Sequence, residues 1–135
     1  PGSGGSDALF QNISGTGSLT KLGSNTLVVT GDNTYSGTTT NSGGILQVGL
    51  GSINDSGTLG TGDVVNNGSL VINRNSTLTI AGNISGTGVI SKNGSGTLIL
   101  TGANTSNGSL AIFSGAVQIG NGGTTGTLGG NLTIE

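Results

Sequence analysis

The sequence predicts an all-β protein built as a right-handed parallel β-helix, a solenoid of about five to six coils. Three observations lead to this fold class. A long motif occurs twice, short segments alternate aliphatic with polar residues, and turn-forming residues separate those segments. Such short strands cannot build a globular core alone, so we expect each strand to stack on its counterpart one coil away.

The repeat is visible in two segments of the chain. Residues 13–31 read ISGTGSLTKLGSNTLVVTG and residues 84–102 read ISGTGVISKNGSGTLILTG, so that Ile13 corresponds to Ile84. The match continues from residues 44–49 to residues 115–120. We therefore expect one continuous solenoid domain in three parts: a Gly/Ser-rich lead-in at 1–12, a first repeat unit at 13–83 and a second, truncated unit at 84–135. At roughly 20–25 residues per coil, a unit would span about three coils.

Alternation identifies the strands, because side chains of a strand point to opposite faces in turn. Leu27 and Val29 share one face, and Leu98 and Leu100 match them in the second unit. The same pattern occurs at residues 46–48, 70–72, 78–80, 117–119 and 132–134. Gly, Asn and Asp between these segments favour the positive-φ turns that short strands require.

Composition leaves two other folds to consider. The chain has 30 glycines among 135 residues and only 2% aromatic residues, which also fits a disordered chain. The small net charge of −2 and the clustering of Leu, Ile and Val favour a folded chain. An antiparallel sandwich would also have short strands, but it does not predict a motif that returns at a fixed long offset.

Several classes of function are disfavoured by composition. The chain has no cysteine, so disulfides and thiol chemistry are excluded. No apolar run approaches the ~18 residues of a transmembrane segment. Three basic residues make too small a footprint for nucleic acid. No segment has the helical period that a dinucleotide or phosphate-binding loop needs, so we expect no cofactor. The Gly-Gly-x-Gly-x-Asp repeat of calcium-binding β-rolls has only a faint, unrepeated echo at residues 4–7, so we expect no metal site.

Residues 13–49 resemble the passenger-associated strand repeat of bacterial autotransporters. The resemblance is carried by residues 13–17, 19–21, 26–31 and 33–37, and the second unit has most of the same pattern, with Ser106 in place of Tyr35. In that family the repeat forms part of a right-handed parallel β-helix that is secreted through a C-terminal β-barrel. The resemblance implies a secreted or cell-surface protein of a Gram-negative bacterium, often an adhesin or another virulence-linked protein, but it does not indicate a ligand.

The residues that chemistry could use are few. We interpret the acids as turn residues rather than a catalytic cluster; they are Asp7, Asp32, Asp55, Asp63 and Glu135. Lys21 and Lys92 occupy equivalent places in the two units and are expected at solvated corners rather than in a binding stripe. Asn-x-Ser/Thr sequons are frequent and are attributed to the composition; examples begin at Asn12, Asn67, Asn83 and Asn131. Phe10, Tyr35 and Phe113 are too scattered for a carbohydrate platform.

We therefore expect a non-catalytic extracellular β-helix segment that serves as a rigid stalk, an adhesive surface or both. Its partners would be an unidentified host or bacterial surface ligand, or other copies of the chain. The alternative is a self-assembling subunit, because a solenoid fragment exposes strand edges at its ends and no good cap is visible in residues 1–12 or 132–135. A polysaccharide-acting enzyme is a third class and would need acids and bases converging on one face.

Overall fold

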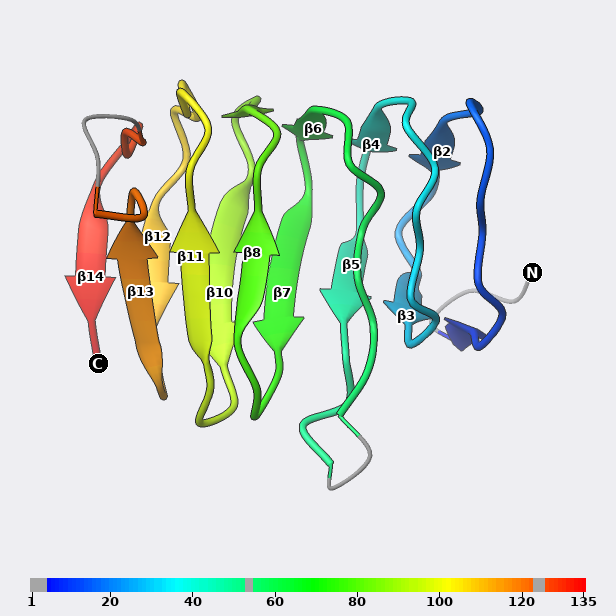
Figure 1. The fold of residues 1–135 in the computed structure, drawn as a ribbon, viewed down its shortest axis with the longest axis horizontal. Helices are drawn as coiled ribbons and strands as arrows, with labels where there is room; N and C mark the ends of the chain where they lie inside the picture. Colours follow the sequence, from blue (N-terminus) through cyan, green and yellow to red (C-terminus); the bar gives the residue numbers. More distant parts are fainter. Residues whose placement is uncertain (1–4, 53–54, 123–125) are drawn as a thin grey trace.

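The computed structural model describes residues 5–52, 55–122 and 126–135, and every regular element in these ranges is a strand (Figure 1). The strands form three parallel sheets. Sheet A contains β1 (Ser6–Leu9), β3 (Thr26–Val29), β5 (Ile45–Val48), β7 (Ser69–Asn73), β10 (Val89–Asn93), β12 (Leu110–Ile112) and β14 (Leu132–Ile134). Sheet B contains β2 (Leu19–Lys21), β4 (Thr39–Asn41), β6 (Val64–Asn66) and β9 (Ile84–Ser85). Sheet C contains β8 (Leu78–Ile80), β11 (Thr97–Leu100) and β13 (Ala116–Ile119).

The predicted parallel β-helix is confirmed, with about six turns. Each strand of sheet A pairs with the strand one coil away, and one registered column runs through Asp7, Leu27, Leu46, Leu70, Ile90, Leu110 and Leu132. The largest sequence separation between paired strands of this column is that between β5 and β7, and the connection between them contains the loop that projects below the rod in Figure 1. The N-terminal lead-in contributes a strand, since β1 pairs with β3; residues 1–4 lie outside the described part of the chain.

The core is a narrow column of aliphatic side chains. Register places the inward residues of sheet A directly above one another, so Leu46 lies between Leu27 and Leu70. Leu46 and Leu70 are fully buried, as are Leu98 and Ile84 on the other two sheets. One cluster of buried residues runs through the stack. Each coil adds only a few such side chains, so stability accumulates from contacts between neighbouring coils.

Glycines line the corner that leads into sheet B. A Cβ atom on Gly82 would lie 2.2 Å from the carbonyl oxygen of Gly62, and one on Gly102 would lie 2.4 Å from that of Gly82. A Cβ atom on Gly37 or Gly62 would likewise overlap a carbonyl oxygen of the preceding coil. Gly17, the first glycine of the column, has no atom within 4 Å of its Cβ position. The backbone of each coil therefore passes so close to the last that a side chain does not fit.

We expect Gly82→Ala to destabilise the protein by about 1–3 kcal/mol or more, because its methyl group would overlap the Gly62 carbonyl and force the coils apart. Gly17→Ala is the matched control at the open end of the same column, and its effect should stay within about 0.5 kcal/mol. Urea unfolding followed by circular dichroism measures both. Equal stability of the two variants would show that the column does not limit the spacing of the coils.

Candidate functional site

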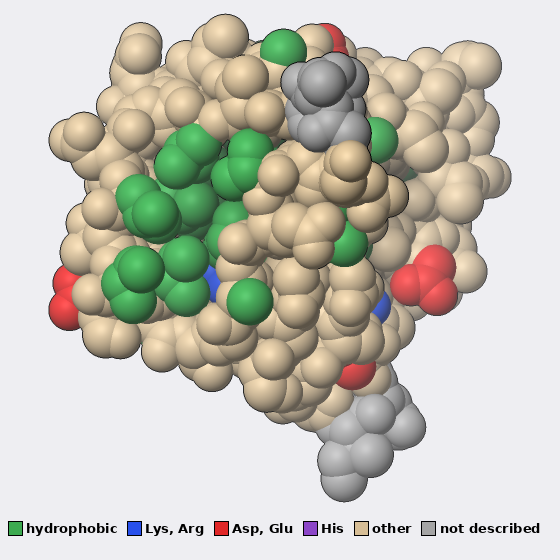
Figure 2. Space-filling model, turned by 60° about the vertical axis from the view of Figure 1, so that its left-hand side comes forward, with side chains coloured by type: hydrophobic (Ala, Val, Ile, Leu, Met, Phe, Trp, Pro, Cys, Tyr) green, Lys and Arg blue, Asp and Glu red, His purple; other side chains and the backbone are tan. Residues whose placement is uncertain are grey.

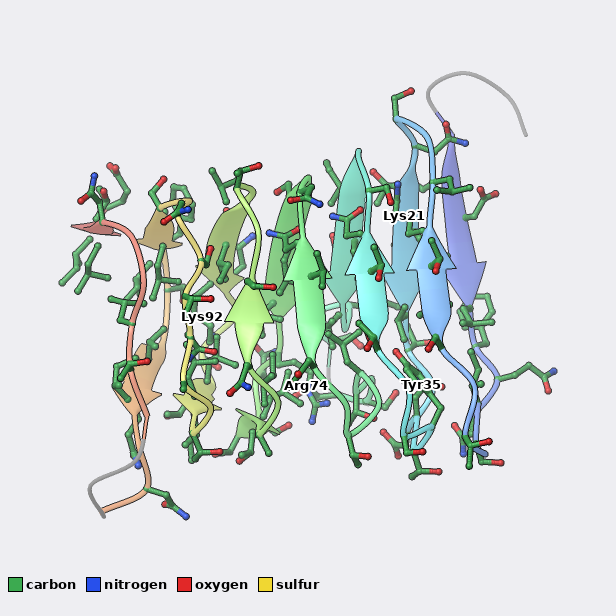
Figure 3. The ribbon with its side chains drawn as sticks, turned by 90° about the horizontal axis from the view of Figure 1, so that it is seen from above. Lys21, Tyr35, Arg74 and Lys92 are labelled. Carbon is green, nitrogen blue, oxygen red and sulfur yellow. The ribbon has the colours of Figure 1, made fainter. Side chains whose placement is uncertain are left out.

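All three basic residues of the chain are buried. Lys92 is 0% exposed, Lys21 is 5% exposed and Arg74 is 8% exposed. The expectation that Lys21 and Lys92 lie at solvated corners is therefore wrong. Figure 3 shows the two lysines and Arg74 at separate places along the stack. A buried cation is costly unless it is hydrogen-bonded, so the partners of each one determine what it does.

The two lysines make the same contacts in the two repeat units. Lys21 Nζ donates to the carbonyl oxygens of Gly23, at 3.0 Å, and of Gly43, at 2.7 Å. Lys92 Nζ donates to Asn93 and Gly94 carbonyls at 2.7 and 2.9 Å, and to the Ser114 carbonyl at 3.5 Å. In both cases one acceptor lies two residues on and another 22 residues on, in the next coil. Each ammonium group thus joins the turns of two successive coils.

The alternation of the sequence contained the signal for this burial. Lys92 pairs with Ile72 on one side and Ile112 on the other, both inward residues of sheet A. It is two residues from Ile90, just as Lys21 is two residues from Leu19, so each lysine shares a face with an aliphatic residue. The preference of lysine for solvent suggested a corner, but the long side chain spans the apolar interior and its Nζ reaches the turn carbonyls.

Burial affects the charge of Lys92. Desolvation lowers the pKa of its ammonium group below the ordinary value of 10.5, and it outweighs the negative charge of Asp55, which raises the pKa. The carbonyl acceptors favour the protonated form, because an ammonium group has only donors.

Arg74 forms an ion pair with Asp55, which lies in the long loop that follows β5. Its Nε lies 3.2 Å from Asp55 Oδ2, one terminal nitrogen donates to the Gly57 carbonyl, and the other donates to Ser76 Oγ at 2.7 Å. Asp55 Oδ2 also accepts hydrogen bonds of 2.6 Å from the backbone N–H and the hydroxyl of Ser76. The cluster fastens the loop to the next coil, so Asp55 is more than the turn residue that the sequence suggested.

The same cluster determines how Asp55 titrates. Burial raises the pKa of the Asp55 carboxyl, but the hydrogen bonds from Ser76 and Asn75 and the charge of Arg74 together outweigh it. The net result is a pKa below the ordinary value of 3.8.

A buried asparagine bridges three coils in each unit. The Ile13 N–H donates to Asn33 Oδ1 at 2.7 Å, and Asn33 Nδ2 donates to the Thr58 carbonyl at 2.7 Å. The Ile84 N–H donates to Asn104 Oδ1 at 2.8 Å, and Asn104 Nδ2 donates to the carbonyl of Thr127 at 2.7 Å. Sequence reasoning missed both residues, although the matching Asn-Thr pairs of the two units pointed to them.

The remaining acids do not converge. Asp32 Oδ1 accepts from the Gly57 N–H at 3.4 Å, and Asp63 Oδ1 accepts from the Asn83 N–H at 2.8 Å. Gly57 lies in the connection between β5 and β6, whereas Asn83 directly precedes β9, so the two carboxylates lie at different positions around the coil. Asp7 and Glu135 are exposed near opposite ends. Within the described ranges, no three His, Cys, Asp or Glu side chains form a group that could hold a metal ion.

Three of the four sequon asparagines named above hold the backbone of the following coil. The oxygens Oδ1 of Asn12, Asn67 and Asn83 accept backbone N–H groups that lie 20 residues further on, at 2.7, 3.3 and 2.8 Å. These asparagines are exposed, and so is Asn131. Their shared role is to satisfy turn N–H groups, as Asx side chains do in turns.

The three aromatic residues do not form a platform. Tyr35 is 1% exposed, and its hydroxyl lies 2.6 Å from Thr39 Oγ1. Phe10 and Phe113 are exposed and belong to different ends of the chain. The equivalent of Tyr35 in the second unit is Ser106, whose buried hydroxyl has no hydrogen-bond partner among the described residues.

The C-terminal end exposes apolar side chains. Leu132 is 51% exposed and Ile134 is 74% exposed, although register places both in the inward column of sheet A above Leu110 and Ile112. Ile119 and Phe113 are also exposed near this end. Figure 2 shows the resulting cluster of hydrophobic side chains on the end of the rod. No helix in the described part of the chain is long and apolar enough to cross a membrane.

Comparison with known proteins gives two matches. Residues 19–48 and 90–126 match the family model described as the passenger-associated-transport repeat. The chain is also similar to the adhesin BmaC autotransporter of Brucella suis biovar 1 (strain 1330), at 46% identity over 141 aligned positions. That alignment covers 90% of this chain but only 4% of the relative. No solved structure matches.

The burial of the lysines predicts slow acetylation of their amines. In the folded protein, an N-hydroxysuccinimide ester should leave the ε-amines of Lys21 and Lys92 unmodified, because both are enclosed and bonded to carbonyl oxygens. The same reagent in concentrated urea should modify both, as peptide mass spectrometry can measure. Rapid modification under native conditions would contradict the buried geometry.

The lowered pKa of Asp55 predicts loss of stability in acid. A carboxyl whose pKa is lower in the folded state contributes stability above its unfolded value of 3.8, and this stability is lost as pH falls through the folded value. Asp55→Asn should cost about 1–3 kcal/mol at pH 7 and show a weaker pH dependence below 3.8. Asp63→Asn, which keeps an acceptor oxygen, is the control and should change stability within about 0.5 kcal/mol. Identical acid dependence of Asp55→Asn and the unchanged protein would contradict this prediction.

Proposed function

Because this chain belongs to the autotransporter passengers that contain passenger-associated-transport repeats, we propose that it is a rigid, non-catalytic segment that presents an adhesive surface. The family places it outside a Gram-negative bacterium, secreted or at the cell surface. The chain spans only 4% of the adhesin that it resembles, so the activity of a whole passenger is part of this proposal.

Rigidity is supported by the continuity of the stack. Sheet A passes through seven strands in parallel register, and one apolar cluster links the coils. The lysine and asparagine bridges add polar contacts between successive turns in the interior of the rod. Bending the rod would separate these paired groups, so the observation that carries the proposal is the unbroken ladder from β1 to β14.

The arrangement of charged groups supports a non-catalytic role. General acid–base chemistry needs a proton donor and acceptor within reach of one substrate. The two lysines and Arg74 are buried and bonded to carbonyl oxygens, while Asp32 and Asp63 accept backbone N–H groups at different positions of the coil. Release of new reducing ends from a panel of polysaccharides by the purified chain would contradict this part of the proposal.

The adhesive role is supported by the named relative, which is an adhesin. The partner that we propose is a host or bacterial surface ligand, and the exposed outward faces of the three sheets are the available surface. Contacts there would be made by hydroxyl, amide and aliphatic groups and by a few dispersed carboxylates, because no Lys or Arg side chain is exposed.

We expect latex beads coated with the folded chain to bind cultured epithelial cells more than albumin-coated beads do. Soluble folded chain should reduce the binding in proportion to its concentration, because it occupies the same receptors. Chain unfolded in urea and diluted into the assay immediately before use is the matched competitor, and it should reduce binding less. Binding equal to that of albumin beads at every coating density would reject the adhesive role.

A second candidate function is end-to-end self-assembly. In the isolated segment Leu132 and Ile134 are exposed and continue the inward column of sheet A, so a second copy of the segment could cover them. The opposite edge of the same sheet is β1, and parallel strands of two copies could pair there. Analytical ultracentrifugation at several concentrations tests this, since a monomer whose sedimentation does not change with concentration would exclude stacking.

A further inference from the structure

Strands that are equivalent in sequence lie on different sheets. In the first unit β2 and β4 belong to sheet B, and β3 and β5 belong to sheet A. Of their counterparts in the second unit, β10 and β12 belong to sheet A, and β11 and β13 belong to sheet C. The chain visits the sheets in the order B, A, C from β6 to β8 and again from β9 to β11. Each strand of the second unit therefore lies one sheet further along the order B, A, C than its counterpart in the first unit.

The local structure of the unit is retained despite the displacement. Lys21 at the B–A corner and Lys92 at the A–C corner make the same contacts with carbonyls two and 22 residues on. Gln47 and Gln118 each donate to the carbonyl two residues on, both at 2.8 Å. The sequence thus specifies a strand–corner–strand module, and that module fits on either pair of faces.

The lengths of the coils explain the displacement. Register in sheet B relates Leu19 to Thr39, Thr39 to Val64 and Val64 to Ile84, so three coils that start at Leu19 end at Ile84. The sequence repeat is longer than these three coils, because the equivalent of Leu19 in the second unit is Ile90. The segment from Ile84 to Ile90 carries the chain from sheet B to sheet A, where Ile90 pairs with Leu70. One repeat unit therefore consists of three complete coils and one further step from a sheet to the next sheet.

We propose that successive repeat units present their equivalent outward surfaces on successive faces of the rod, so that partners are bound around the axis rather than along one side. At about 4.8 Å per coil, neighbouring units are offset by about 16 Å along the axis, and the same face recurs after about 48 Å. A flat partner on one side of the rod would contact the equivalent surface of every third unit only. Separate ligand molecules, one bound to each unit, are the occupants that this geometry fits. The choice of ligand rests on the proposed adhesive function, whereas the displacement itself does not.

Engineered disulfides test the displacement directly, because the chain has no cysteine of its own. Ser91 is the registered neighbour of Val71 on sheet A, and both are outward residues. If the second unit kept the faces of the first, Ser91 would instead lie beside Val65 of sheet B. Adjacent strands bring Cα atoms within the range that a disulfide spans. Thr20 and Thr40, which are paired in sheet B, provide the positive control.

We expect Val71→Cys/Ser91→Cys to cross-link under mild oxidation as completely as Thr20→Cys/Thr40→Cys, and Val65→Cys/Ser91→Cys to cross-link at least tenfold less. Circular dichroism of each reduced variant verifies that it is folded, and Thr79→Cys/Ile99→Cys offers a second registered pair, on sheet C. Preferential cross-linking of Val65→Cys/Ser91→Cys would overturn the proposal.

The ligand class is tested separately with the bead assay on cultured epithelial cells. Streptavidin attached through a biotinylated cysteine at Gln47, on sheet A, or at Gln118, on sheet C, should each reduce binding by about half. Blocking both positions should abolish it. Complete loss after blocking either position alone would overturn the proposal of separate ligands. Absence of binding by the unblocked chain would instead reject the adhesive function and leave the disulfide result unaffected.

Discussion

The constraint on which the structure depends is that each coil must repeat the backbone path of the previous coil at the spacing of paired strands. Parallel strands pair only with the strand one coil away, so every residue has a near neighbour about 20 positions along the chain. An inward aliphatic residue therefore needs an aliphatic residue above it, and a corner needs glycine where the turns nearly touch. Gly82 between Gly62 and Gly102 is an example of the second requirement.

The same constraint determines where the polar groups go. At the corners, the carbonyl and N–H groups of a turn cannot all pair within the sheets, and buried unpaired groups are costly. Lys21 and Lys92 supply donors to carbonyl oxygens of two turns at once, while Asn33 and Asn104 supply an acceptor to one coil and a donor to another. These four residues occur at matching positions of the two units because they satisfy matching corners. Their repetition reflects the demands of the fold rather than a ligand.

The sequence was sufficient for the fold but not for the interior polar network. Alternation and the long repeat predicted the parallel β-helix and its inward aliphatic faces, since a period of two is a strong signal when one face is buried. The lysines were misplaced because their charge was weighted above the alternation that they share with Leu19 and Ile90. The ion pair of Arg74 with Asp55 joins residues from two coils, and neither residue lies in a segment matched between the two units, so no pattern in the sequence pointed to it. The change of sheet between units depends on coils of unequal length, which only strand register shows.

Placing every cation inside leaves an outer surface whose charges are all negative. Asp7, Asp32, Asp63 and Glu135 are exposed, whereas Asp55 is paired with Arg74 within the stack. Four dispersed charges produce a weak field, which salt screens within about 8–10 Å. Long-range attraction can thus contribute little to binding, and what there is favours cationic partners. Recognition by this segment must depend on short-range contacts, and these accumulate only where several outward residues meet the same partner. That requirement makes the direction in which each repeat unit faces as important to adhesion as the residues it presents.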